Sequence, residues 1–123
     1  MELADLAGRV LKALEHYECF IFERAELERV RELVAKAELA ELVSIRRVDP
    51  RYEDIMVLAP RTRDLEAQCV SWVQQLLAQG SIGPEEYKRD RLRLLEQCVR
   101  SRERERVREL MDKLRKYLER LSS

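Results

Sequence analysis

The sequence predicts an α+β protein that is mostly helical, with N-terminal helices and a small antiparallel sheet followed by a C-terminal helical hairpin and a long helix. Apolar residues recur at three- and four-residue steps over most of the 123 residues. Three Gly and three Pro are too few for the turns of an all-β sandwich. We expect one domain, in which a small α/β layer formed by residues 1–63 packs against the helices of residues 64–123.

Two helices are expected in the first half of the chain. Residues 3–17 place apolar side chains on one face and charged side chains on the other. Residues 24–42 are rich in Ala, Leu, Glu and Arg and contain neither Gly nor Pro, which predicts a second, uninterrupted helix.

Short strands are expected beside these helices. Residues 43–48 and 55–59 are apolar or β-branched, and the turn chemistry around Pro50 between them predicts a β-hairpin. Residues 19–22 form a third short run that can join the hairpin. An isolated hairpin is only marginally stable, so these strands must pack on the helices.

The second half of the chain is expected to be helical. A helix over residues 65–79 ends at a break over residues 80–84, which contains two Gly and one Pro. Residues 84–121 then form either one long helix or two helices joined near Ser101. The pattern leaves both alternatives open.

The stretch from Ala67 to Pro84 carries no charge, in a chain in which 39% of residues are charged. On a helix, its apolar side chains fill an arc wider than one buried stripe needs. The remaining arc holds small or amide side chains: Ala67, Gln68, Ser71, Gln74, Gln75, Ala78 and Gln79. The helix is either covered on most sides within a monomer or forms a protein interface. We favour the interface, because so short a chain rarely covers one helix on every side.

The C-terminal helix shows a heptad seam of about two repeats. Its apolar residues are Val107, Leu110, Met111, Leu114, Leu118 and Leu121. The seam can pack on the 65–79 helix of the same chain or on a second copy.

Together these features predict a non-enzymatic assembly or adaptor protein that forms a homodimer or binds another protein. The expected interface combines the uncharged helix with the seam. Its residues are Leu65, Cys69, Trp72, Val73, Gln75, Leu76, Gln79, Val107, Leu110, Met111, Leu114 and Leu118.

Residues 73–95 combine a Leu-rich helix, a Gly with an Ile two residues on, an acidic pair before an aromatic, and a basic helix that ends in two leucines. The matching residues are Leu76, Leu77, Gly80, Ile82, Glu85, Glu86, Tyr87, Leu94 and Leu95. This pattern resembles the short helical module called SHOCT. The resemblance implies oligomerisation or partner binding rather than catalysis.

A dimeric DNA-binding regulator is the alternative, because the order helix, strand, helix, hairpin is similar to that of a winged helix. Its nucleic-acid contacts would be Arg46, Arg47, Arg51, Arg100 and Arg104. Two features oppose it. No turn divides residues 24–42 as a helix-turn-helix requires, and residues 1–45 hold 10 acidic and 6 basic residues, a net charge of −4.

Catalytic, metal and small-molecule sites are not expected. There is a single His, the three Cys lack metal-ligand spacing, and no Gly-rich phosphate loop is present. We therefore predict no cofactor. No apolar stretch is long enough to cross a bilayer, and the acidic start is unlike a secretory signal, so we expect a cytoplasmic protein.

The composition favours a thermophilic origin. The chain contains no Asn, and 19 Arg stand against 5 Lys, which suits dense ion pairing at high temperature. Intracellular disulfides form in some hyperthermophiles. One bridge among Cys19, Cys69 and Cys98 is therefore left open by the sequence.

We predict a thermal unfolding midpoint above about 65 °C, the upper end of the usual mesophile range. The expected reason is the loss of thermolabile amides together with Glu/Arg pairing. Circular dichroism at 222 nm during heating measures the midpoint, and a value below this range contradicts the prediction.

Overall fold

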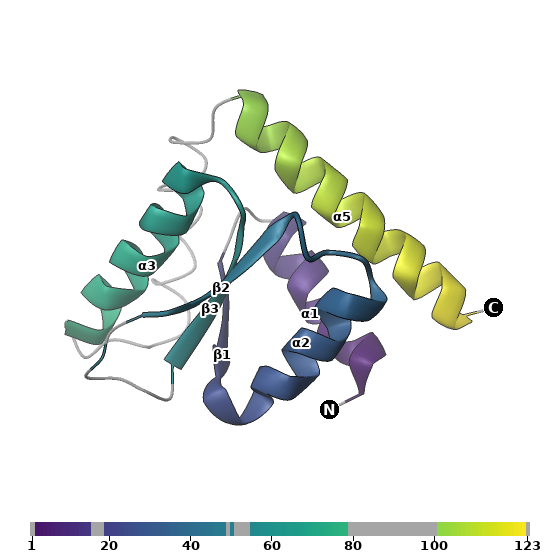
Figure 1. Cartoon of the computed structure of the whole chain (residues 1–123), viewed down its shortest axis with the longest axis horizontal. Helices are drawn as coiled ribbons and strands as arrows, with labels where there is room; N and C mark the ends of the chain where they lie inside the picture. Colours follow the sequence, from purple (N-terminus) through teal and green to yellow (C-terminus); the bar gives the residue numbers. More distant parts are fainter. Residues whose placement is uncertain (1, 16–18, 49, 51–54, 79–100, 123) are drawn as a thin grey trace.

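A three-stranded antiparallel sheet lies between two helical layers. The computed structural model describes residues 2–15, 19–48, 50, 55–78 and 101–122. Helix α3 (Arg63–Ala78) lies on one side of the sheet (Figure 1). Helices α1 (Leu3–Glu15), α2 (Leu27–Lys36) and α5 (Ser101–Ser122) lie on the other. The expected α+β, mostly helical fold class is confirmed.

The sheet has the order β1–β3–β2, and both pairings are antiparallel. Its strands are β1 (Phe20–Glu23), β2 (Val43–Arg47) and β3 (Ile55–Pro60). Leu58 of the central strand lies between Phe20 of β1 and Ile45 of β2. The predicted hairpin and its third strand are both confirmed.

The central strand is buried on both faces of the sheet. Successive residues of a strand point to opposite faces, and the neighbouring residues Val57 and Leu58 are 0% and 3% exposed. Leu58 belongs to the main core and Val57 to a smaller cluster on the other face. Burial on both faces explains why β3 is a continuous apolar run rather than an alternating one.

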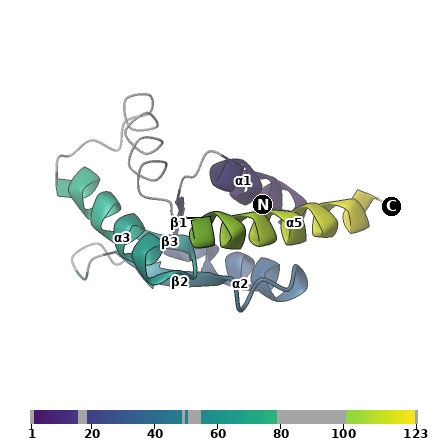
Figure 2. The ribbon, with the colours of Figure 1, turned by 90° about the horizontal axis from the view of Figure 1, so that it is seen from above.

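The main core forms between one face of the sheet and the layer of α1, α2 and α5. Helix α5 packs along α1 and extends past the end of α2 (Figure 2). The buried residues of α1 are Leu6, Ala7, Val10 and Leu14, and those of α5 are Val107, Leu110, Leu114 and Tyr117. Both sets recur at three- and four-residue steps, so each helix buries one stripe.

Two cations of α5 also bind the carboxyl end of α2. Lys113 Nζ donates a hydrogen bond to the carbonyl oxygen of Glu38 at 2.9 Å, and Arg120 Nη2 donates to that of Lys36 at 3.3 Å. Carbonyls at the end of a helix have no partner within the helix and carry its partial negative charge. The two hydrogen bonds therefore satisfy carbonyl groups at the end of α2, and they also fix the position of α5 relative to α2.

The prediction of one helix over residues 24–42 is wrong at both ends. Residues Arg24–Glu26 form a 3₁₀ turn, η1, and α2 ends at Lys36. The end is a Schellman motif, in which the Leu39 N–H donates to the Val34 carbonyl at 2.8 Å and the Glu38 N–H donates to the Ala35 carbonyl at 3.3 Å.

Glu38 adopts a left-handed conformation with φ of 59° in this motif. The position usually holds Gly, because a Cβ is crowded there. The reversal turns Leu39 and Leu42 into the core, where they are 0% and 5% exposed. Without a Gly, the sequence carries no signal of this helix end.

A disulfide joins Cys19, just before β1, to Cys69 in the middle of α3. The two half-cystines are 50 residues apart in sequence and are 2% and 1% exposed. Closing a loop of this length is worth about 4 kcal/mol in the chain-entropy model. The third cysteine, Cys98, lies outside the described residues.

The predicted break over residues 80–84 also lies outside the described residues. Of the long C-terminal helix expected over residues 84–121, the structure describes the part that forms α5, Ser101–Ser122.

We predict that Glu38→Gly raises the free energy of unfolding by about 0.5–1 kcal/mol, because Gly adopts the left-handed conformation without a Cβ penalty. Urea denaturation measures the change. Glu38→Ala is the matched control, since it removes the carboxylate but keeps the Cβ. A Gly variant no more stable than the Ala variant contradicts the prediction.

Candidate interface on α3

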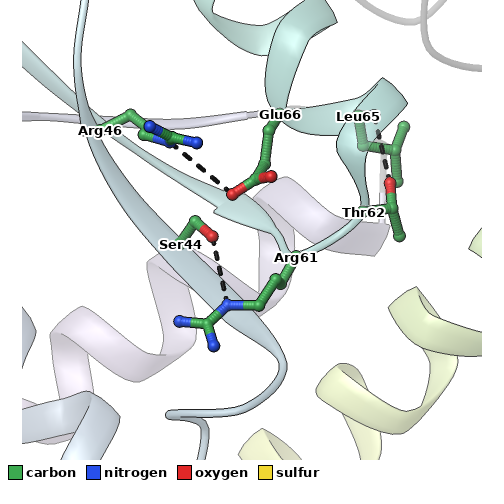
Figure 3. A network of polar contacts seen from close by, with 6 residues as sticks. All are labelled: Ser44, Arg46, Arg61, Thr62, Leu65 and Glu66. Carbon is green, nitrogen blue, oxygen red and sulfur yellow. Dashed lines mark hydrogen bonds and ion pairs between the residues drawn. The ribbon is translucent and has the colours of Figure 1, made fainter.

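Helix α3 begins after Thr62, whose side chain caps it. Thr62 Oγ1 accepts a hydrogen bond from the Leu65 N–H at 3.1 Å (Figure 3), so one of the free N–H groups of the first turn is satisfied. Leu65, Cys69 and Val73 then recur every four residues and are buried. These three residues form the stripe by which α3 packs on the sheet.

The apolar cluster beyond the main core, on the α3 side of the sheet, is small. It contains the buried valines Val48, Val57 and Val73. Three partly buried residues pack against them: Ile21, Ile55 and Val70. The other two buried residues of α3, Leu65 and Cys69, belong to the main core.

Polar contacts add to the attachment of α3. Gln74 Nε2 donates a hydrogen bond to the carbonyl oxygen of Val48 at 2.7 Å, just beyond the end of β2. Arg46 Nε of β2 lies 3.8 Å from Glu66 Oε1, and the Arg46 side chain is 58% exposed (Figure 3). The Glu66 side chain is 16% exposed, so the ion pair is half-buried.

The outer side of α3 carries a stripe of exposed, uncharged side chains. Its members are Ala67, Ser71, Gln75 and Ala78. We call this set the neutral stripe. Its spacing of four, four and three residues keeps it on one face, opposite the buried stripe of Leu65, Cys69 and Val73.

The other exposed helix faces are different in character. Helix α2 carries the exposed pairs Arg29–Glu32, Arg31–Glu28 and Lys36–Glu32. Helix α5 exposes a run of mostly charged residues that begins at Arg104. The first turn of α3 also exposes charge, at Arg63 and Asp64, but from Ala67 to Ala78 its exposed side chains are uncharged.

The structure divides the predicted interface into core and surface. Leu65, Cys69 and Val73 are buried within the chain, and Gln75 is exposed. The side chains of Trp72 and Leu76, together with Gln79, lie outside the described residues.

The heptad seam packs within the same chain, against α1 and the main core. Val107, Leu110 and Leu114 are buried, and Met111 and Leu118 pack against the same core. Val107, Leu110 and Leu114 are therefore covered within the chain, whereas Leu121, the last residue of the seam, is 49% exposed. The physical reason is that the sheet face carrying Leu58 needs cover, and α5 supplies part of it.

The arginines expected to contact nucleic acid are dispersed. Arg46 is paired with Glu66, and Arg47 is exposed on the same strand. Arg104 is exposed near the start of α5. Arg51 and Arg100 lie outside the described residues.

A shallow cleft of about 440 Å³ separates the end of α2 from the last turns of α5. Its lining mixes both charge signs: Ala37, Glu38, Lys113, Lys116, Glu119 and Arg120. Lys113 and Arg120 already donate to α2 carbonyls. Two of the four cleft residues that α5 contributes are therefore already used to hold α5 against the end of α2.

We predict that Leu114→Ala lowers the free energy of unfolding by about 3 kcal/mol, since it leaves a cavity at a fully buried position. The change is the same at low and high protein concentration, because the seam packs within one chain. Urea denaturation at two concentrations measures both. Leu121→Ala is the control: Leu121 is 49% exposed, and its loss costs less than about 0.5 kcal/mol. Equal losses for the two variants contradict the packing.

Neither a metal site nor a related protein identifies a function. Within the described ranges, no group of three His, Cys, Asp or Glu residues is placed to hold a metal ion. None of the described helices has the length and apolar character needed to cross a membrane. Most of the segment that resembles SHOCT lies in residues 79–100, outside the described part. No protein-family model, curated protein or solved structure matches this chain.

Proposed function

We propose that the protein is a non-enzymatic assembly protein that self-associates as a dimer through the neutral stripe of α3. The observation that carries the proposal is the exposure of Ala67, Ser71, Gln75 and Ala78 on one helix face. No charged residue occurs from Ala67 to Ala78, although 39% of the chain is charged.

The side chains of the neutral stripe suit close helix packing. Ala and Ser are small, so two helix backbones can approach closely, and the Gln75 amide can both donate and accept hydrogen bonds. Packing of this kind needs no large apolar patch. Leu121 of α5 is the one large apolar side chain that is strongly exposed among the described residues.

Self-pairing follows from the absence of charge. In a two-fold dimer the same surface patch meets itself, so a charge on the patch faces a like charge nearby. A neutral patch avoids this repulsion without any charge pattern. A different partner could instead be matched by opposite charges across the interface.

The position of α3 adds further support. Helix α3 is the only described helix on its side of the sheet (Figure 1), so its outer face has no cover among the described residues. Because the heptad seam is used within the chain, the proposed interface is restricted to α3. An interface formed by one helix from each copy is small, and small interfaces belong to weak complexes. We therefore expect a dissociation constant in the micromolar range.

The experiment is light scattering coupled to size exclusion, with the protein at about 10–100 μM. We predict a mass approaching twice the 14.6 kDa of one chain. Ser71→Arg places two like charges at the centre of the interface and weakens association by about a hundredfold or more, which leaves a monomer.

Ala35→Arg is the matched control. Ala35 is an exposed residue of α2, so this variant gains the same charge away from the neutral stripe and keeps the wild-type mass. A wild-type monomer over this range, or a Ser71→Arg variant that stays dimeric, refutes the proposal.

The runner-up function, a DNA-binding regulator, is separated by fluorescence anisotropy with duplex DNA at low and high salt. Phosphate contacts weaken steeply as salt rises. Exposed Arg47 and Arg104 support this alternative. The pairing of Arg46 with Glu66 and the balanced charges of α2 oppose it.

A further inference from the structure

The attachment of α3 to the sheet depends on few noncovalent contacts among the described residues. Those that the structure describes are the buried side chains of Leu65, Cys69 and Val73, the partly buried Val70, one hydrogen bond from Gln74, and the ion pair of Glu66 with Arg46. By contrast, α1 and α5 bury four residues each in the main core, and α5 also binds the carbonyls of Lys36 and Glu38.

The Cys19–Cys69 disulfide adds a covalent bond to these noncovalent contacts. It joins the middle of the buried stripe of α3 directly to the residue that precedes β1. It adds a covalent link at the middle of α3 to the chain connections at the two ends of this helix. Regions with few apolar contacts are the first to open in a native protein, so breaking this bond affects α3 before the other layer.

We propose that the Cys19–Cys69 disulfide is a redox-controlled tether of α3: a dithiol reductant releases α3 from the sheet, while the sheet and the layer of α1, α2 and α5 stay folded. Release also disperses the neutral stripe, so reduction dissociates the dimer. That last consequence rests on the proposed function, whereas the tether itself does not.

The chemistry is thiol–disulfide exchange. A thiolate of the dithiol attacks one sulfur, which forms a mixed disulfide and releases the other cysteine as a thiolate. The second thiolate of the dithiol then displaces the remaining cysteine. Two electrons pass from the dithiol to the protein disulfide, which leaves Cys19 and Cys69 as thiols after protonation and the reductant as a cyclic disulfide.

Burial makes the exchange depend on opening. Cys19 and Cys69 are 2% and 1% exposed, so an attacking thiolate reaches a sulfur only through a local opening around the disulfide, which precedes the release of α3. Once the bond is broken, the open state gains the chain entropy of the freed segment between the end of β3 and Cys69. For a loop of about ten residues this gain favours opening by a factor on the order of a hundred.

The test is hydrogen exchange with mass spectrometry on the Cys98→Ser variant, with and without dithiothreitol. The substitution removes the third thiol, so no other pairing can form. Peptides from α3 are expected to exchange about a hundredfold faster after reduction. Peptides from α1 and α5 are expected to change by less than about threefold.

Two results overturn the tether: equal protection of α3 in both states, and an equal loss of protection in α1, α3 and α5, which would make the bond a support of the whole fold. A Cys19→Ala/Cys69→Ala variant provides a second reading, since its α3 peptides exchange fast with or without dithiothreitol. If that variant does not fold, the reduced and oxidised states of Cys98→Ser still decide the outcome.

Light scattering of the same two states separates the tether from the proposed function. A dimer that dissociates on reduction supports both. A monomer in both states refutes self-association, while hydrogen exchange still decides the tether. A dimer that persists although α3 has lost its protection refutes the use of α3 as the interface.

Discussion

A small sheet whose central strand is apolar on both faces must be covered on both faces, and the rest of this structure follows from that requirement. Val57 and Leu58 point in opposite directions and are both buried. Neither face can be left to water, because each buried aliphatic side chain contributes roughly 1.5–3 kcal/mol. The chain meets the requirement by placing helices from its two ends on one face and a single helix on the other.

The two covers are built differently. The α1–α5 layer uses long apolar stripes and cations that bind the carboxyl end of α2. The α3 layer uses a short stripe, a few polar contacts and a disulfide. A single helix buries only its inner side, and from Ala67 to Ala78 the exposed side chains of α3 are uncharged.

The elements that depend on a local sequence pattern could be predicted. The features that depend on contacts between distant segments of the chain could not. Apolar steps predicted α1, α3 and α5, and short β-prone runs predicted the three strands. Periodicity shows that a face is apolar but not what covers it. The seam that begins at Val107 was expected on the 65–79 helix or on a second copy, and it packs against α1 and the main core. Glu38 gives no warning of a left-handed helix end. The pairing of Cys19 with Cys69 depends on a tertiary contact between segments 50 residues apart.

The disulfide also changes the connectivity of the molecule. Residues 19–69 form a closed covalent ring that contains α2 and every strand of the sheet, while α1 and α5 are its two linear tails. A single proteolytic cut inside the ring would leave both fragments joined by sulfur, and a cut in either tail would leave the strands connected in one piece. Helices α1 and α5, which lie outside the ring, pack against each other and cover one face of the sheet that the ring contains.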